Sequence, residues 1–241
     1  MSFLNAQWKN LALINFEIDA KLLEKYIPAG TELDIWNNKC YVSLVGFIFK
    51  ETRVLGLKIP FHVDFEEVNL RFYVKRFEKG DWKRGVVFIE EIVPKKAITF
   101  IANSLYQEHY ETQKMRHKIL ENKNTKTFIY QWKVDKKWNT IKLETKKEAT
   151  EIEIDSESEF ITEHYFGYTK CDNITTFEYE VKHPRWEQLE VINFMLKVDF
   201  QKNYGADFSV LQNAKPISVF LAKGSNIKVE NKKTIRHEYQ P

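Results

Sequence analysis

The sequence predicts an α+β fold built mostly from antiparallel sheet, with a few helices packed on the sheet or at its end. Short alternating or continuous apolar runs recur along the whole chain, whereas helical periodicity is confined to a few segments. Hydrophobic residues make up 43% and aromatic residues 15% of the 241 residues, so the chain can bury a large core. No repeat or low-complexity linker divides it, and we expect one domain over residues 1–241.

The first part of the chain is expected to form short β elements with one short helix. Asp19 can cap that helix, which the breakers Pro28 and Gly30 end. Residues 39–50 then alternate and run apolar, as a buried strand does.

The segment 65–74 is expected to be a strand whose two faces differ in chemistry. Because side chains alternate across a strand, one face is apolar and consists of Val68, Leu70, Phe72 and Val74. The other face carries Glu67, Asn69, Arg71 and Tyr73. Such a polar face is either solvated, which is common in antiparallel sheets, or the wall of a pocket, and both interpretations stay open.

A further strand at 85–91 precedes the clearest helix of the chain. Pro94 suits the first helical position. Apolar residues then fall at i, i+3, i+4 and i+7, namely Ile98, Ile101, Ala102 and Leu105. This spacing predicts a stripe that faces the core.

The remainder is expected to contain strands and one more short helix. Residues 127–145 alternate around a polar turn at 135–137, which predicts a β-hairpin with a lysine-rich outer face. Ser156 and Glu159 have capping-box spacing, so a helix should run from Glu157 to about His164. Other strand-like runs lie at 165–170, 175–182, 216–222 and 227–229.

The composition argues against several classes of protein. The 37 basic and 34 acidic residues nearly balance, so a nucleic-acid partner is not expected. The eight glycines form no GxGxxG or GxxxxGK[ST] loop, and we expect no cofactor. No stretch approaches 18 uncharged apolar residues and no leader-like segment opens the chain, so we expect a soluble protein with no membrane partner.

Cysteine and histidine spacing gives no metal signature. Cys40 and Cys171 lack CxxC spacing, so we expect reduced thiols in a cytoplasmic protein, a disulfide being the alternative. None of the six histidines is paired as HxH or HxxxH, and no metal site is expected. A GxSxG nucleophile elbow is also missing.

Two polar groups are candidates for chemistry. Arginine is scarce, with seven in the chain, so Arg71 beside Glu67 and Asn69 is informative, because arginine binds carboxylates in a bidentate way. Lys95 and Lys96 are adjacent cations, and a desolvated lysine beside another cation becomes the neutral amine that forms Schiff bases. Two surface lysines at a helix start are the alternative.

The order of several polar segments resembles the YqjF-like family of uncharacterised bacterial proteins. The segments extend over most of the chain and are 65–71 (F-x-E-x-N-x-R), 106–110 (YQEHY), 115–117 (MRH), 160–165 (FITEHY), 183–186 (HPRW) and 219–225 (VFLAKGS). The resemblance implies a single domain but no assigned activity. It adds four ligand-binding candidates, Arg116, His117, Glu163 and Tyr165.

The YqjF-like family in turn resembles the acetoacetate decarboxylase superfamily. That resemblance implies a large bent antiparallel sheet closing towards a cone-like barrel around an apolar cavity. Phe65-Glu66-Glu67 would match the decarboxylase Tyr-x-Glu, and Pro94-Lys95-Lys96 its Pro-Lys-Lys, which makes Lys95 the expected Schiff-base lysine. Phe65 departs from the tyrosine of that pattern.

Two functions follow as hypotheses. The first is a pocket for a small molecule, a carboxylate or keto acid, with Arg71 and Asn69 as ligand-binding residues and Glu67 as acid or base. Its sharpest form is a lyase or decarboxylase that works through Lys95. The alternative is a non-catalytic binding or structural domain in which the polar row ties strands together. The sequence leaves the ligand, the reaction and the oligomeric state open.

Overall fold

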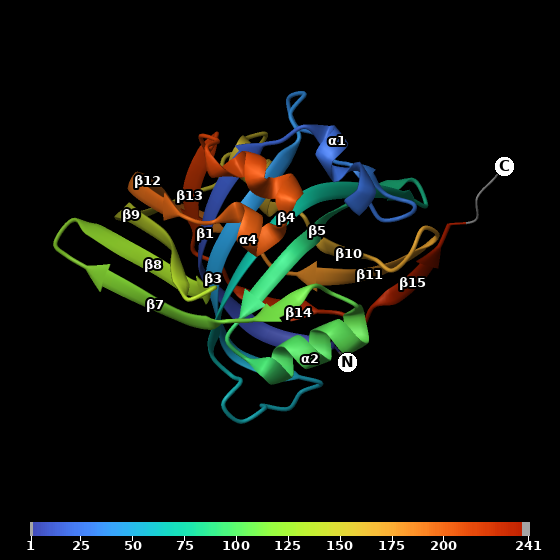
Figure 1. The fold of residues 1–241 in the computed structure, drawn as a ribbon, viewed down its shortest axis with the longest axis horizontal. Helices are drawn as coiled ribbons and strands as arrows, with labels where there is room; N and C mark the ends of the chain where they lie inside the picture. Colours follow the sequence, from blue (N-terminus) through green and yellow to red (C-terminus); the bar gives the residue numbers. More distant parts are fainter. Residues whose placement is uncertain (1, 238–241) are drawn as a thin grey trace.

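The computed structural model describes residues 2–237, most of which lie in strands (Figure 1). The strands are β1 (Leu4–Glu17), β2 (Glu32–Leu33), β3 (Tyr41–Val54), β4 (Phe65–Glu78), β5 (Asp81–Val93), β6 (Tyr110–Thr112), β7 (Lys114–Glu121), β8 (Thr125–Val134), β9 (Lys137–Glu151), β10 (Phe166–Lys170), β11 (Thr175–Lys182), β12 (Glu187–Lys197), β13 (Ser218–Ala222), β14 (Asn226–Val229) and β15 (Lys233–Arg236). The helices are α1 (Ala20–Leu23), α2 (Lys96–Tyr106), α3 (Glu157–Thr162) and α4 (Phe200–Tyr204), with 3₁₀ turns at Glu24–Tyr26 and Ala206–Gln212.

Seven strands close into a barrel. The order is β14-β11-β10-β5-β4-β3-β1, and β1 pairs again with β14. All neighbours in this ring are antiparallel except β10 and β5, which are parallel. The predicted α+β class and the bent, barrel-like sheet are therefore confirmed.

Strand β1 belongs to the barrel and to a second sheet. Its first half, Leu4–Gln7, pairs with β14, whereas Leu11–Asn15 pair with β13. Strand β13 then leads through β12, β9 and β8 to β7. Figure 1 shows β7, β8 and β9 as an arm to the left of the barrel. A sheet that branches in this way leaves β1, β3 and β4 buried on both faces.

Two separate cores occupy those two faces. One lies between the barrel and the arm and includes the apolar parity of β4, Val68 to Val74. The other lies inside the barrel and includes Phe65 and Tyr73 from the opposite parity. The apolar face predicted for this strand is confirmed, and its polar partner face points into the barrel.

Most predicted elements are confirmed, with small shifts at their ends. Asp19 caps α1 and Ser156 caps α3 through its side chain, as expected. Helix α2 begins at Lys96 rather than at Pro94, and Lys95 is its N-cap residue. Helix α3 ends at Thr162, before His164. Strands β6, β7, β12 and β15 and helix α4 were not predicted.

Both cysteines are free thiols, as expected, with Cys40 buried and Cys171 half-buried. Over residues 2–237, no helix has the length and hydropathy needed to cross a membrane.

Candidate functional site

The barrel encloses a cavity of about 120 Å³. Its wall is mostly apolar and rich in aromatic rings, including Trp8, Phe47, Phe49, Phe65, Phe88, Tyr106, Tyr110, Phe166, Tyr179 and Trp186. Eight polar residues join that wall, namely Glu67, Asn69, Arg71, Glu91, Glu108, Thr162, His164 and His183. An apolar cavity with a few convergent polar groups is the usual form of a small-molecule site.

Strand β4 supplies the polar row that the sequence singled out. Glu67 is 2% exposed, Asn69 is 1% exposed and Arg71 is 7% exposed, and all three line the cavity. The polar face is therefore a buried wall and not a solvated surface. Asn69 Nδ2 donates to Glu67 Oε1 at 2.9 Å, but Arg71 makes its hydrogen bond elsewhere.

Strand β5 adds a carboxyl group that the sequence analysis missed. Val86 and Phe88 line the cavity, so simple alternation would place residue 90 there next. The register with β4 shifts between Leu70 and Arg71, which marks a β-bulge. Because a bulge inserts one extra residue, the alternation changes and Glu91 lines the cavity instead.

The turn after α2 supplies the third carboxyl group. Gln107 ends the helix with a left-handed backbone, φ 55°, and its N–H donates to the Asn103 carbonyl. The Asn103 side chain donates to the Tyr110 carbonyl at 2.9 Å and accepts from the Tyr110 N–H at 2.8 Å. This fixed turn places Glu108 and Tyr110 on the cavity wall.

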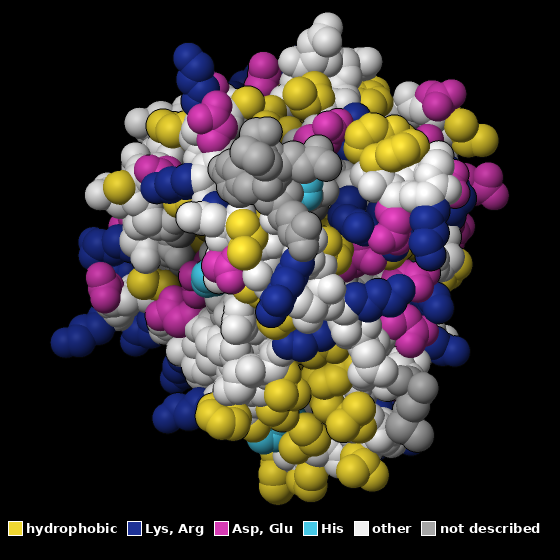
Figure 2. All heavy atoms as spheres, turned by 90° about the vertical axis from the view of Figure 1, so that its right-hand side faces the viewer, with side chains coloured by type: hydrophobic (Ala, Val, Ile, Leu, Met, Phe, Trp, Pro, Cys, Tyr) yellow, Lys and Arg dark blue, Asp and Glu magenta, His cyan; other side chains and the backbone are white. Residues whose placement is uncertain are grey.

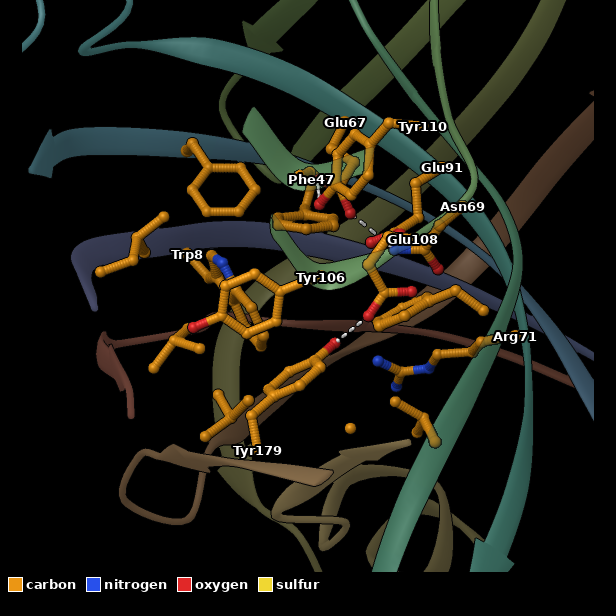
Figure 3. Close-up of a pocket in the computed structure, with 18 of the residues that line it drawn as sticks. Trp8, Phe47, Glu67, Asn69, Arg71, Glu91, Tyr106, Glu108, Tyr110 and Tyr179 are labelled. Carbon is orange, nitrogen blue, oxygen red and sulfur yellow. Dashed lines mark hydrogen bonds between the residues drawn. The ribbon is translucent and has the colours of Figure 1, made fainter. Parts of the chain in front are cut away.

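Tyrosine and threonine hydroxyls satisfy two of these carboxyl groups. Tyr110 donates to Glu67 Oε2 at 3.2 Å. Glu108 Oε1 accepts from Thr169 at 2.8 Å and from Tyr179 at 2.9 Å. Glu91 Oε2, by contrast, is buried and has no partner within residues 2–237. Figure 3 shows Glu67, Glu91, Glu108 and Arg71 directed towards the same space.

Burial dominates the protonation of these carboxyl groups. It raises the pKa of Glu67 to about 7, against the lowering effect of hydrogen bonds from Asn69 and Tyr110. Burial also raises the pKa of Glu108 to about 7. The pKa of Glu91 is raised well above its ordinary range, first by burial and then by the charges of Glu108 and Glu67. The cavity therefore holds acids that exchange protons near neutral pH.

Arg71 is the cationic pole of the cavity. Its Nη2 donates to the Ile161 carbonyl at 3.4 Å, a long hydrogen bond, while its Nε has no partner in the part of the chain that the structure describes. The guanidinium lies 5.7 Å from the Tyr73 ring centre. Among the described ion pairs, none involves Arg71.

Helix α3 and the residues after it close the wall next to Arg71. Ser156 Oγ accepts from the Glu159 N–H at 3.1 Å, and this cap fixes the start of the helix. Thr162, His164 and Phe166 face the cavity, whereas the alternate residues Glu163 and Tyr165 do not line it. Glu163 and Tyr165 instead hydrogen-bond each other.

The other predicted site residues lie outside the cavity wall. Lys95 is half-buried at the start of α2 and does not line the cavity. His117 pairs with Glu66 at 2.6 Å, on the face of β4 opposite Glu67. Arg116 is exposed on β7, where its guanidinium stacks 4.2 Å from the centre of the Trp138 ring. The structure thus brings Glu67, Asn69 and Arg71 together and leaves the remaining predicted site residues apart from them.

Helix α2 covers the lower end of the barrel (Figure 1). Ile98, Ile101 and Ala102 from the predicted stripe line the cavity. Leu105 was predicted to face the core with them, but it is 48% exposed near the end of the helix. Figure 2 shows apolar side chains gathered at this end of the molecule. The exposed large apolar residues of α2 and of the segment between β3 and β4 are Leu55, Leu57, Phe61, Phe100 and Leu105.

Gly167 on β10 makes room for a ring that holds Glu108. A Cβ at this position would collide with the Tyr179 ring. We therefore expect Gly167→Ala to displace Tyr179 and to lower the free energy of unfolding by about 2 kcal/mol, as overpacking does. Urea denaturation measures this loss. In a Tyr179→Ala background the same methyl group should cost far less, and an equal cost in both backgrounds would contradict the steric explanation.

Within residues 2–237, no group of three or more His, Cys, Asp or Glu side chains is arranged to hold a metal ion.

The closed seven-stranded barrel has the acetoacetate decarboxylase-like fold, as its similarity to solved structures shows. The structure is similar to acetoacetate decarboxylase from Legionella pneumophila, with a TM-score of 0.66 and 13% identity over 96% of this chain and 86% of that one. It is also similar to the enduracididine biosynthesis enzyme MppR in complex with pyruvate, with a TM-score of 0.67 and 9% identity over 97% and 91% of the two chains. At these identities, the comparison establishes the shared fold.

The chain belongs to the DUF2071 family of uncharacterised conserved proteins, whose pattern matches residues 5–226. It is also 25% identical over 182 residues to the uncharacterised protein YqjF of Bacillus subtilis, which is 74% of this chain and 72% of that protein. The resemblance inferred from the polar segments is confirmed.

Proposed function

We propose that this chain binds a small carboxylic acid in the barrel cavity, with the carboxylate held by Arg71. The observation that carries the proposal is the environment of this guanidinium. Arg71 is 7% exposed, and no carboxylate among the described residues pairs with it. The unused donors of a buried guanidinium favour a ligand that accepts them in a bidentate way, as a carboxylate does, so the site favours an anionic ligand.

The carboxyl groups of the cavity can supply acid–base chemistry. Glu67, the carboxyl group on the same strand as Arg71, has a pKa raised by burial to about 7, so it gains or loses a proton readily at neutral pH. We propose that Glu67 is the acid or base that acts on the bound molecule. Because Lys95 does not line the cavity, the proposal involves no Schiff base at that residue.

The similar structures support a small acid as the ligand. One MppR structure contains pyruvate, and the acetoacetate decarboxylases are named for a small oxo acid. A cavity of about 120 Å³ suits a ligand of that size.

The alternative, in which the row only ties strands together, has less support. Asn69 and Glu67 bond within one strand, and Arg71 reaches α3 through one long hydrogen bond. Among the described residues, only the Tyr110 to Glu67 hydrogen bond joins the side chains of the row to another strand.

Binding of small acids tests the proposal directly. Acetate, propionate, pyruvate, lactate and acetoacetate should raise the melting temperature of the wild-type protein in a dose-dependent way, because a ligand that binds only the folded state stabilises it. The matching amides and alcohols of the same size serve as controls. Equal shifts with the neutral controls would contradict an anion site.

Proton uptake tests the role of Glu67. An anion bound near this carboxyl group raises its pKa further, so binding at pH 7.5 should draw a proton from the buffer. Isothermal titration calorimetry in buffers of different ionisation enthalpy should report about half a proton per bound acid. Glu67→Gln should reduce that number, whereas Glu153→Gln, at an exposed position, should leave it unchanged.

A further inference from the structure

A hydrogen-bonded chain runs from the surface of the protein to the cavity through three side chains. Arg84 Nε donates to Asp34 Oδ2 at 2.6 Å. The same Asp34 oxygen lies 3.0 Å from His164 Nε2. Arg84 is partly exposed, Asp34 is buried, and His164 is 7% exposed and lines the cavity.

The hydrogen bonds that link Arg84, Asp34 and His164 fix the tautomer of His164. Arg84 and His164 stabilise the ionised carboxylate of Asp34, whose pKa lies below its ordinary value although burial opposes this. An ionised carboxylate only accepts hydrogen bonds, so His164 Nε2 carries the proton and donates it. Burial lowers the pKa of His164 to about 4, which keeps the ring neutral. Nδ1 is therefore a bare acceptor.

The acceptor is buried, and the ring that carries it is held firmly. His164 Nδ1 has no hydrogen-bond partner within residues 2–237. The ring packs against Tyr73, with 4.7 Å between centres, and against Phe160, at 5.1 Å. An unpaired acceptor on a fixed ring at a cavity wall is a feature that a ligand donor would satisfy.

His164 lies beside the anion-binding arginine. Arg71 donates to the carbonyl of Ile161, three residues before His164. Both side chains also pack on Tyr73, the guanidinium at 5.7 Å and the imidazole at 4.7 Å from the ring centre. The charge of Arg71 is also among the causes that lower the pKa of His164, so the imidazole lies within electrostatic range of the guanidinium that would hold the ligand carboxylate.

We infer that His164 recognises a hydroxyl group on the carbon adjacent to the ligand carboxylate, so that the ligand class is a 2-hydroxy acid. This inference rests on the proposed function, since it assumes a carboxylate at Arg71. A hydroxyl donates a hydrogen bond to the unprotonated Nδ1. A ketone oxygen has no proton to donate, and its lone pairs repel the lone pair of Nδ1. His164 is a specificity residue whose Nδ1 accepts the hydrogen bond of the hydroxyl, and Asp34 holds the imidazole in the required orientation.

Three acids of equal carbon number test this assignment on the wild-type protein: propionate, pyruvate and lactate. We expect calorimetry at pH 7.5 to show lactate binding at least tenfold more tightly than pyruvate or propionate, because a buried acceptor left unpaired disfavours the ligands without a donor. Equal affinities for the three acids would overturn the inference and leave the anion site intact. Absence of binding by all three would overturn both.

Two variants at position 164 separate recognition from structure. His164→Phe keeps an aromatic ring but removes the acceptor, so the lactate preference should vanish while propionate affinity stays. His164→Asn places an amide oxygen near the position of Nδ1 and should restore part of the preference. A lactate preference that persists in His164→Phe would overturn the role of His164.

The tautomer has its own measurement, which needs no variant to bind ligand. In protein with ¹⁵N-labelled histidine, the signal that disappears in His164→Phe should show a protonated Nε2 and a bare Nδ1 at pH 7.5. A proton on Nδ1 would overturn the inference. Asp34→Asn should alter this tautomer and weaken the lactate preference together, because the amide no longer requires a donor at Nε2.

Discussion

Replacing Arg71 by methionine should lower the affinity for small carboxylic acids at least a hundredfold without lowering the melting temperature. A buried, bidentate pair between a guanidinium and a carboxylate is among the stronger polar contacts in proteins. A hundredfold loss corresponds to about 3 kcal/mol of binding free energy, within the usual effect of removing one partner of a buried charge pair. Calorimetry with propionate measures the loss.

The expected effect on stability distinguishes a binding residue from a structural one. In the unliganded protein, Arg71 gains one long hydrogen bond to Ile161 and no ion pair among the described residues. Methionine retains much of the apolar stem and removes the buried charge, so the folded state should be as stable as before or more so. A melting temperature several degrees lower, with acid binding retained, would favour the structural interpretation of the polar row.

Two controls complete this experiment. Arg71→Lys keeps the charge but loses the planar pair of donors, and should cost about tenfold in affinity. Arg53→Met removes an exposed arginine outside the cavity wall and should leave propionate binding unchanged. If Arg53→Met weakened binding as much as Arg71→Met, the effect would be one of net charge and not of the cavity.

Alternation in strand β4 was the part of the site that sequence could predict. Its apolar and polar parities are unambiguous, and together they predict one face towards a core and one face of uncertain exposure. The structure resolves that uncertainty because the sheet closes into a barrel and also packs against the β7–β9 arm. Neither of these long-range events leaves a signal in the local pattern.

Five polar residues of the cavity wall escaped prediction, and for three of them, Glu91, Glu108 and His164, separate physical reasons can be given. Glu91 is displaced by a bulge, whose position depends on the pairing of β4 with β5. Glu108 lies in a turn, where no periodicity applies, although the resemblance to YqjF-like proteins contained it in the 106–110 segment. His164 follows a short helix, so the choice between Glu163, His164 and Tyr165 depended on where that helix ends.

Adjacency in sequence misled the interpretation of Arg116 and His117. Both lie in a segment of the family resemblance, yet β7 is the last strand of the arm and lies outside the cavity wall. His117 pairs with Glu66, which lies on the same strand as Glu67 but points to the other face of that strand. Two neighbouring residues on a strand, such as Glu66 and Glu67, point to opposite faces of the sheet.

The second large effect concerns Glu91 and the dependence of stability on pH. The folded protein raises the pKa of this carboxyl group well above its ordinary value, chiefly through burial. Above about pH 4.5 the unfolded chain releases the proton while the folded protein keeps it, so the unfolded state binds fewer protons. Glu91 therefore lowers the free energy of unfolding least at acidic pH, and it lowers this free energy more as the pH rises.

Glu91→Gln should remove this dependence, because glutamine mimics the neutral acid at every pH. Between pH 5 and pH 8, the free energy of unfolding of the variant should rise relative to that of the wild type, by at most about 1.4 kcal/mol per pH unit for one proton. Buried histidines such as His164, whose pKa is lowered, stabilise the fold as the pH rises towards 6.5, but they act equally in both proteins and cancel in the difference.

Urea denaturation of both proteins at pH 5, 6, 7 and 8 gives the required free energies. Glu153→Gln is the matched control, since Glu153 is exposed, and its difference from the wild type should stay constant with pH. A constant difference for Glu91→Gln as well would mean that Glu91 is already ionised in the folded state. In that case Glu91 would compensate the charge of Arg71 within the same cavity, and Arg71 would not favour an anionic ligand.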